Sequence, residues 1–367
     1  MTDAIAKPNR DLQSEFLTLH EFIPAAQAAM TDEGWDYLIG GTETETTLAR
    51  NRAALDTVAL RPRVLVDVSD IDSSADFLGQ KVRLPVSLAP VGGLEVCDPE
   101  GAKAVAEGAG AFGVPMTLSS VSKRTKAEIR GATQAPAVFQ LYVRGGDRYI
   151  EDHVEEAIEQ GLDAFCFTVD TAVYSRRERD IVRRFDKPWR QHVDQAAVRA
   201  QASLSWADIA RIRKAYDIPL ILKGIMTVED ARIAADHGVE VVYISNHGGR
   251  QLDHGLGCLD VLPQIRAALG PKTKIMVDGG FSRGTDIVKA VALGAHSVGL
   301  GRLYCYGLAA AGPAGVVRLL EILENEVHSA LGLVGVTSFA ELTPDHVAAG
   351  AAMVTRPGVH SAFPLLD

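Results

Sequence analysis

The sequence predicts an α/β fold, a closed (β/α)₈ TIM barrel that follows an N-terminal helical extension. Apolar, β-branched runs recur eight times at regular spacing, and an amphipathic segment follows each of them. The runs are nearly continuous in apolar residues, which suits parallel strands covered on both faces. The length of 367 residues matches one barrel with extensions. A doubly wound sheet is the alternative, but no glycine-rich dinucleotide motif follows the first strand.

The predicted strands, in chain order, are 86–90, 115–119, 137–143, 164–170, 219–225, 241–247, 274–279 and 297–302. Helical patterns between them include 147–160, 205–216, 227–237 and 285–293. Ser205 and Thr227 are suitable N-caps, and Gly161, Gly238 and Gly294 follow helix ends. Eight successive βα units without a break favour a closed barrel.

Three parts of the chain are distinguished by their patterns. Residues 1–60 are expected to form a helical segment that packs on the barrel, with helices at 21–33 and 42–55 joined by 34–41. Residues 61–345 form the barrel, and residues 346–367 are a weakly patterned tail expected on the surface. No linker or separate second domain is indicated.

Composition excludes several classes of protein. The 37 basic and 47 acidic residues give a net charge of −10, which argues against a nucleic-acid partner. No run approaches the roughly 20 apolar residues of a membrane span, and the N-terminus lacks an apolar signal region. Cys97, Cys166, Cys258 and Cys305 are scattered without metal-ligand spacing. We therefore expect free thiols, no metal site and a cytoplasmic location.

Polar residues end many of the predicted strands, where a barrel of this kind carries its active site. Such groups are costly at the end of an apolar strand unless they are used. Together they predict one mouth lined by hydrogen-bonding groups and positive charge. The strand ends carry Ala89-Pro90-Val91, Ser119, Gln140 with Tyr142, Thr168 with Asp170, Lys223, Asn246-His247, Asp278-Gly279-Gly280 and Gly301-Arg302.

The segment SNHGGRQLD, residues 245–253, is the most informative. His247 can act as a base near pH 7, and Arg250, after a Gly-Gly turn, can hold a carboxylate with two parallel hydrogen bonds. A lone histidine at a strand end is more often structural, but the eight residues around this one favour a catalytic role.

This segment resembles the signature of the FMN-dependent 2-hydroxy acid oxidase and dehydrogenase family, which includes glycolate oxidase, lactate oxidase, mandelate dehydrogenase and hydroxymandelate oxidase. The resemblance extends over about residues 35–335. Further matching motifs follow in family order: LRPRVLVDVSDID (60–72), MTLSS (116–120), FQLYV (139–143), TVDT (168–171), RRERD (176–180), LKGI (222–225), DGG and RGTD (within 278–286) and LGR (300–302).

The resemblance implies specific catalytic roles. His247 matches the base that removes a proton from the substrate, and Asp170 matches the carboxylate that stabilises its imidazolium. Tyr142 matches the tyrosine that faces the substrate hydroxyl, and Lys223 matches the lysine beside flavin N1. The implied substrate-binding residues are Tyr37, Tyr142, Arg177, His247 and Arg250.

The cofactor implied by the resemblance is FMN. Its ring is expected along the first strand end and its phosphate over the seventh and eighth strands, where many barrels bind phosphate. The implied FMN-binding residues are Ala89, Pro90, Val91, Ser119, Gln140, Thr168, Lys223, Ser245, Asp278, Gly280, Arg283, Gly301 and Arg302.

Three departures from the family pattern lead to further expectations. Ser282 stands where the family often has an arginine, so the FMN phosphate contact is expected to weaken or to shift to Arg283. Gly92 and Gly93 are expected to leave room over the flavin for a larger substrate. The segment between Arg184 and Ser205 looks shorter than the usual lid, which predicts a more open mouth.

The function expected from this resemblance is oxidation of an (S)-2-hydroxy acid of medium or large side chain, such as mandelate, with oxygen as acceptor. The electrons leave the substrate as a carbanion or as a hydride, and the sequence does not separate the two. The alternatives are a dehydrogenase that reduces a quinone or a protein, and a non-catalytic flavin-binding barrel. An NAD-dependent enzyme is disfavoured because no dinucleotide motif is present. The resemblance also implies a homo-oligomer, a tetramer or octamer.

Overall fold

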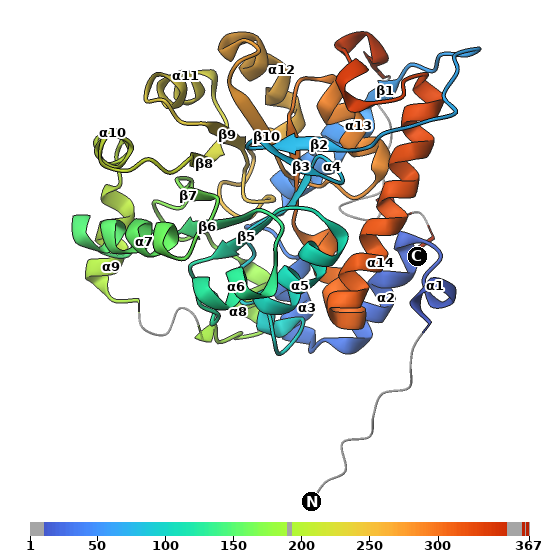
Figure 1. Cartoon of the computed structure of the whole chain (residues 1–367). Coiled ribbons are helices and arrows are strands. Elements are labelled where there is room, and N and C mark those ends of the chain that lie inside the picture. Colours follow the sequence, from blue (N-terminus) through green and yellow to red (C-terminus); the bar gives the residue numbers. More distant parts are fainter. Residues whose placement is uncertain (1–10, 189–192, 351–361, 364, 367) are drawn as a thin grey trace, which may run out of the picture.

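A computed structural model describes residues 11–188, 193–350, 362–363 and 365–366. Eight parallel strands form a closed barrel in the order β10-β11-β4-β5-β6-β7-β8-β9, which confirms the predicted fold (Figure 1). The strands are β4 (Val86–Leu88), β5 (Met116–Ser119), β6 (Ala137–Leu141), β7 (Ala164–Thr168), β8 (Leu220–Ile225), β9 (Val241–Ile244), β10 (Lys274–Val277) and β11 (Ser297–Leu300).

Most of the strands end before the residues predicted to end them. His247, for example, lies three residues beyond the end of β9. Its φ of 61° is in the left-handed region, so the chain has already turned out of the sheet there. The polar residues at the carboxyl ends therefore belong to the loops above the barrel rather than to its wall.

Helices surround the barrel in Figure 1. Two of the predicted N-caps are present, because Thr227 accepts a hydrogen bond from the Asp230 N–H and Ser205 forms a capping box with Asp208. Gly161, Gly238 and Gly294 have positive φ just beyond helix ends, as predicted. The helices are α5 (Ala102–Phe112), α6 (Lys126–Ala132), α7 (Asp147–Glu159), α8 (Glu178–Val182), α9 (Gln195–Ser203), α10 (Trp206–Ala215), α11 (Val228–Asp236), α12 (Cys258–Leu269), α13 (Gly284–Ala292) and α14 (Arg302–Val334).

Helix α14 is two helices joined at a kink, since Ala311 and Gly312 have non-helical φ and ψ and Pro313 follows them. By length and composition alone it is the one helix in the described ranges that could cross a membrane. More than half of its apolar window is buried inside the molecule, and it packs on α2 and α5. Its apolar character is therefore explained by the core.

From residue 11 onward, the N-terminal segment contains four helices: α1 (Leu12–Glu15), α2 (Leu19–Ala29), α3 (Asp32–Ile39) and α4 (Thr46–Thr57). The prediction of two helices joined by 34–41 is therefore wrong. Thr31 ends the first predicted helix early, because its side chain accepts from the Gly34 N–H and begins α3. Most of the expected connection is consequently helical, with Tyr37 and Leu38 buried.

Two pairs of short strands lie outside the barrel. One pair joins the N-terminal segment to residues after the last barrel helix, and the other closes the bottom of the barrel. The N-terminal β1 (Val58–Leu60) pairs antiparallel with β12 (Val347–Ala349), which follows the short 3₁₀ turns η3 (Phe339–Glu341) and η4 (Pro344–His346). The hairpin of β2 (Ala75–Phe77) and β3 (Gln80–Val82) sends Phe77 and Val82 into the barrel interior. Only the opposite end, with the carboxyl ends of the strands, remains available for a site.

The prediction that the tail, residues 346–367, lies on the surface is only partly correct. Phe363 is fully buried and packs edge-on against His20, with ring centroids 5.5 Å apart. Two apolar residues, Ala362 and Phe363, therefore return to the core instead of lying on the surface. Residues 351–361 lie outside the described part of the chain.

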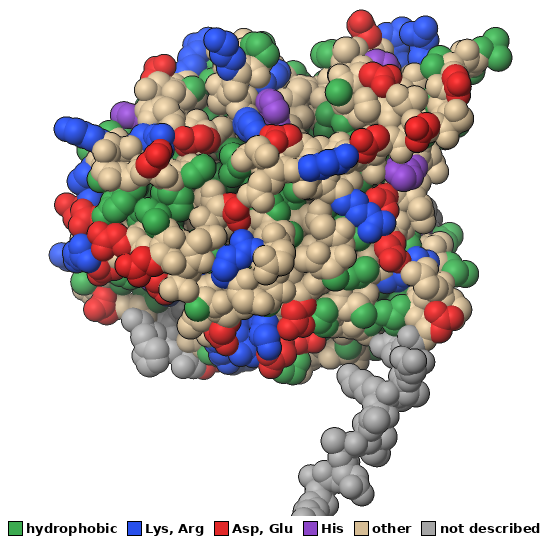
Figure 2. Space-filling model, in the orientation of Figure 1, with side chains coloured by type: hydrophobic (Ala, Val, Ile, Leu, Met, Phe, Trp, Pro, Cys, Tyr) green, Lys and Arg blue, Asp and Glu red, His purple; other side chains and the backbone are tan. Residues whose placement is uncertain are grey.

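The remaining global predictions concern thiols and charge. All four cysteines are free, as predicted. Acidic and basic side chains are interspersed on the face drawn in Figure 2, so this face has no broad basic surface of the kind that nucleic acid requires.

Candidate active site

A cavity opens at the carboxyl ends of the barrel strands. Its empty volume, counted out to the open solvent at the mouth, is about 1400 Å³. The predicted site residues that line it are Tyr37, Ala89, Pro90, Val91, Tyr142, Arg177, Lys223, His247, Arg250, Asp278, Gly280, Gly301 and Arg302.

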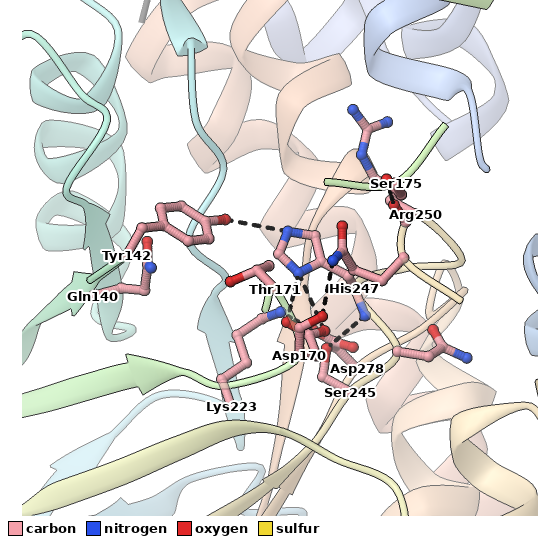
Figure 3. A network of polar contacts seen from close by, with 12 residues as sticks. Gln140, Tyr142, Asp170, Thr171, Ser175, Lys223, Ser245, His247, Arg250 and Asp278 are labelled. Carbon is pink, nitrogen blue, oxygen red and sulfur yellow. Dashed lines mark hydrogen bonds and ion pairs between the residues drawn. The ribbon is translucent and has the colours of Figure 1, made fainter. Parts of the chain in front are cut away.

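His247 lies at the centre of a chain of polar contacts (Figure 3). Its Nδ1 is 3.1 Å from Asp170 Oδ1 and 3.2 Å from Oδ2, and its Nε2 is 3.2 Å from the Tyr142 hydroxyl. The backbone N–H of His247 donates to Ser245 Oγ at 3.1 Å, which helps to hold the left-handed backbone. Because a carboxylate can only accept, Nδ1 carries the proton, and Nε2 presents its lone pair to the cavity.

Electrostatics keep this histidine neutral. Burial lowers the pKa of His247 to about 4 and Lys223 adds to the effect, while Asp170 opposes it. Burial alone would raise the pKa of Asp170, but its neighbours His247 and Lys223 lower it below the usual value. At neutral pH the pair is therefore a carboxylate and an uncharged imidazole, the form in which Nε2 can accept a proton.

Lys223 provides a buried positive charge beneath this pair. Its Nζ lies 3.9 Å from Asp278 Oδ2. Burial would lower the pKa of Lys223, but the carboxylates of Asp278 and Asp170 raise it, so the ammonium group stays charged. A fixed cation at this point stabilises negative charge that develops on a group in the cavity.

Three arginines gather at the upper rim of the cavity. Arg250 Nη1 donates to the carbonyls of Tyr37 and Gly40, both at 2.7 Å. Arg302 donates to the carbonyls of Leu38 and Gly40. These partners are carbonyls, not carboxylates, so they orient the guanidinium groups without neutralising their charge.

The arginine charges repel one another. Burial lowers the pKa of Arg250 to about 9, and the neighbouring Arg177 and Arg302 contribute, although Arg250 is still largely protonated at neutral pH. Arg177 Nε is 3.4 Å from Ser175 Oγ, within the same loop. Uncompensated cations in a buried site are stabilised by bound anions. The rim is therefore suited to a substrate carboxylate and to a phosphate.

Tyr37 joins the N-terminal segment to this rim. Its hydroxyl donates to the carbonyl of Gly92 at 2.8 Å, and the Arg250 guanidinium lies 4.9 Å from the centre of its ring. Helix α3, which the sequence pattern did not reveal, thus presents one aromatic side chain and three backbone carbonyls to the site.

Buried polar atoms without protein partners fit a flavin. Gln140 Nε2, Thr168 Oγ1 and Asp278 Oδ1 have no hydrogen-bond partner, although each is buried. Ser119 Oγ donates to Gln140 Oε1 at 2.9 Å, which turns the amide nitrogen away from it. The donors and acceptors surround Lys223 at the ends of β6, β7 and β10, as the edge of an isoalloxazine ring requires.

Glycines provide the place for the phosphate end. Gly279 and Gly280 have φ of 100° and 85°, a conformation that side chains rarely adopt. A Cβ at Gly301 would meet no atom within 4 Å, so open space lies beside this backbone and Arg302. The residues present therefore fit FMN, with its phosphate toward Gly280, Ser282, Gly301 and Arg302.

Arg283 is a correction to the predicted site. Its Nε donates to Glu326 on α14 at 3.1 Å and its Nη1 to the Ala362 carbonyl at 3.1 Å, and it does not line the cavity. Ser282 lines the cavity instead, with its hydroxyl 3.1 Å from the Gly280 carbonyl. Glu326 holds the guanidinium away, so a shift of the phosphate contact to Arg283 is not supported.

The two glycines after β4 are a second correction. A Cβ at Gly92 would lie 2.5 Å from Val121 Cγ2, so Val121 already occupies that space. Gly93 has φ of 69° and precedes the 3₁₀ turn η1 (Leu94–Val96), which is a backbone requirement. Neither glycine leaves room for a larger substrate.

The short segment after Arg184 also contributes to the cavity wall. Helix α9 places Gln201 against the cavity, where its amide donates to the Thr171 carbonyl. This segment therefore covers one side of the site. Residues 189–192 of the expected lid lie outside the described residues.

Several lining residues were missed by sequence reasoning. Arg52 on α4 is buried, forms two hydrogen bonds with Asp286 at 2.7 and 2.8 Å, and donates to the Gly280 carbonyl. Its partner lies more than 200 residues away, so no local pattern marks it. Other cavity residues that were not predicted are Val121, Arg144, Tyr174, Gln201, Gln251 and Phe281.

Comparisons with known proteins find relatives that match most of the chain. The model of the FMN-dependent dehydrogenase family matches residues 26–349. A peroxisomal (S)-2-hydroxy-acid oxidase of Oryza sativa subsp. japonica is 38% identical over 349 residues, which cover 90% of this chain and 95% of that protein. An L-lactate oxidase of Nostoc sp. is 35% identical over 351 residues, covering 89% and 96%. A crystal structure of mandelate oxidase with (S)-2-phenylpropionate superimposes with a TM-score of 0.85 and 38% identity, covering 91% of this chain and 99% of that one.

Proposed function

Because this chain belongs to the FMN-dependent dehydrogenase family, we propose that it oxidises an (S)-2-hydroxy acid of medium or large side chain and passes the electrons to oxygen, which forms hydrogen peroxide. The chain is an FMN-dependent enzyme that acts on the CH–OH group of a hydroxy acid. The observation that carries the proposal is the Asp170–His247–Tyr142 chain, which faces Arg177 and Arg250 across one cavity.

In the proposed reaction, Arg177 and Arg250 bind the substrate carboxylate and thereby fix the α-carbon over the barrel. This places the substrate hydroxyl near Tyr142 and His247. FMN, when bound, supplies the acceptor for two electrons. His247 Nε2 takes a proton, from the α-carbon if a carbanion forms or from the hydroxyl if a hydride leaves. Asp170 then stabilises the imidazolium across its hydrogen bond.

Lys223 acts electrostatically. Its ammonium is fixed between Asp278 and Asp170 before substrate arrives, so no reorganisation is needed when negative charge develops in the cavity. The negative charges of Asp278 and Asp170 raise the pKa of Lys223, so that its ammonium group stays charged although it is buried.

Oxygen as the acceptor is supported by the relatives, which are described as (S)-2-hydroxy-acid, lactate, glycolate and mandelate oxidases. A medium or large side chain is supported by the apolar wall that Val91 and Val121 form in the cavity. Gly92 adds no further room for the substrate side chain, because Val121 occupies the space beside it.

The test is a spectroscopic titration of the purified FMN-loaded protein with 2-hydroxy acids of increasing size: glycolate and the (S)-enantiomers of lactate, 2-hydroxyoctanoate and mandelate. Each is added without oxygen while the flavin absorbance is followed, and air is then readmitted. We expect mandelate or 2-hydroxyoctanoate to give the highest kcat/KM, with fast reoxidation and one peroxide per substrate. Glycolate or lactate ranking first would contradict the size proposal, and slow reoxidation would favour a quinone or protein acceptor.

We also propose a cytoplasmic homo-oligomer. The loop between β1 and β2 projects from the body of the molecule in Figure 1, with Val64 at 80% and Leu65 at 104% exposure. Apolar side chains exposed in this way are covered when another subunit packs on them. Free thiols suit a reducing compartment. Light scattering of the protein and of a Leu65→Glu variant tests the assembly, since a monomeric wild type would contradict it.

A further inference from the structure

One wall of the cavity lies above β4, β5 and β6. Val91, Val121 and Arg144 line it, each from the loop that follows one of these strands. Two apolar side chains and one guanidinium group thus stand together on this side. None of the roles described so far uses Arg144.

The topology separates Arg144 from the phosphate region. In the barrel order, β6 lies four positions from β10 and is therefore diametrically opposite to it. Gly280 and Ser282 follow β10, so the phosphate end of FMN and Arg144 lie on opposite sides of the mouth. Arg144 is consequently placed to meet the substrate rather than the nucleotide phosphate.

The substrate has three groups to distribute over the cavity in addition to the α-hydrogen. Its carboxylate takes the side of Arg177 and Arg250, and its hydroxyl takes the side of Tyr142 and His247. The third group, the side chain, can extend along the wall of Val91, Val121 and Arg144, which adjoins Tyr142. Arg144 follows Tyr142 by two residues, and both side chains line the same cavity.

We propose that, among 2-hydroxy acids of medium or large side chain, this enzyme prefers those whose side chain ends in a second carboxylate, and that Arg144 binds this distal carboxylate. The proposal rests on the proposed function and adds the class of its substrate. Val91 and Val121 contact the apolar middle of the side chain. The planar guanidinium of Arg144 matches the geometry of a carboxylate, as those of Arg177 and Arg250 do at the other end.

The test compares two substrates that share a six-carbon chain, (S)-2-hydroxyadipate and (S)-2-hydroxyhexanoate, which end in a carboxylate and in a methyl group. Holoenzymes of the wild type and of Arg144→Met are assayed for kcat/KM. Methionine keeps the length of the side chain without its charge. We expect Arg144→Met to lower kcat/KM for 2-hydroxyadipate by roughly ten- to a hundredfold, and to leave 2-hydroxyhexanoate within about twofold.

Two further measurements separate recognition from structure. Arg176→Met is the matched control, because Arg176 is an exposed arginine of the rim that pairs with Glu178 at 3.1 Å and does not line the cavity. Arg176→Met should leave kcat/KM unchanged for both substrates. Calorimetric titration should show that Arg144→Met binds the product 2-oxoadipate more weakly than the wild type does. Its affinity for the product 2-oxohexanoate should equal that of the wild type. If that variant does not fold, Arg144→Lys should show a smaller loss with the same selectivity.

Each outcome has one interpretation. An equal loss on both substrates, or no loss on either, would overturn the role of Arg144 in recognition. A wild type that oxidises 2-hydroxyhexanoate and mandelate but not 2-hydroxyadipate would also overturn it, while the proposed function would stand. A wild type with bound FMN that oxidises none of the three would instead contradict the proposed function.

Discussion

The Tyr142 hydroxyl and Nε2 of His247 lie 3.2 Å apart, although 105 residues separate them in the chain. Tyr142 follows β6 and His247 follows β9, so the contact crosses the mouth of the barrel. Nε2 therefore has a hydroxyl in hydrogen-bonding range before substrate enters. A substrate hydroxyl that replaces this partner meets the same base, which motivates the first prediction.

Replacing His247 with alanine should slow flavin reduction by roughly 10²–10⁴-fold, because the group that accepts the proton is lost. FMN should remain bound, since the cofactor contacts come from other residues. Anaerobic stopped-flow absorbance measures both. His254→Ala is the control, because this histidine of the same loop is largely exposed. Near-normal reduction in His247→Ala would show that another group is the base.

The acid limb of the pH profile should lie well below neutrality. His247 must be neutral to accept a proton, and its pKa is lowered to about 4. The kcat/KM should therefore rise as pH increases through about 4 and stay level toward pH 7, since this ratio reports the free enzyme. Asp170 raises the pKa of His247, so Asp170→Asn should move the limb lower. A limb centred at the ordinary 6.5 would contradict the assigned environment.

Arg250→Lys should weaken substrate binding, raising KM roughly tenfold or more with little loss of FMN. Lysine keeps the charge but loses the planar pair of donors that matches a carboxylate. It also loses the contacts to the Tyr37 and Gly40 carbonyls. Steady-state kinetics with mandelate and lactate measure the effect, and Arg176→Lys is the control. An unchanged KM for both acids would rule out Arg250 as the clamp.

Arg302 and Arg283 should differ in their effect on FMN affinity. Arg302→Met removes a cavity cation beside Gly301 and should weaken FMN binding by roughly tenfold or more. Arg283→Met should leave that affinity nearly unchanged while lowering the melting temperature, because it breaks the pair with Glu326. Fluorescence titration of the apoproteins with FMN measures the dissociation constants. Equal losses in both variants would restore Arg283 to the phosphate site.

Gly299→Ala should strongly destabilise the barrel. The new Cβ would lie 2.1 Å from the Tyr243 hydroxyl, in a buried core where overpacking typically costs about 1–3 kcal/mol. Tyr243→Phe should rescue part of this loss, because it removes the closest atom but leaves the ring carbon at 3.1 Å. Thermal unfolding measures each variant. Gly131→Ala, where a Cβ meets nothing within 4 Å, is the control, and an equal effect there would contradict the steric reason.

Local patterns were enough to predict the barrel, since each barrel strand is a short buried run and several helices begin at a capping residue such as Thr227 or Ser205. The same patterns located His247, Asp170 and Lys223 in sequence, and the structure brings them together. These residues share the ends of neighbouring or facing strands, so the fold class alone predicts their proximity.

Features that depend on residues far away in the sequence could not be predicted from local patterns. Arg283 follows the position of the family's phosphate ligand and was expected to replace it, but Glu326, 43 residues later, binds Arg283. Gly92 lacks a side chain, but Val121 fills its space. Helix α3 begins at a cap inside what reads as one continuous helix. In each case a contact from elsewhere in the chain, or a competing cap, decides the outcome.

The dependence of the rim on the N-terminal segment has a consequence for biosynthesis. The carbonyl of Gly40 is held by Arg250 and Arg302, which lie 210 and 262 residues later in the chain. The N-terminal segment is therefore translated long before the residues that hold it, and it can dock only after most of the barrel has been made. Until then, Arg250 and Arg302 lack the Gly40 carbonyl that orients their guanidinium groups. The rim of the cavity is consequently complete only when segments far apart in the sequence have packed together.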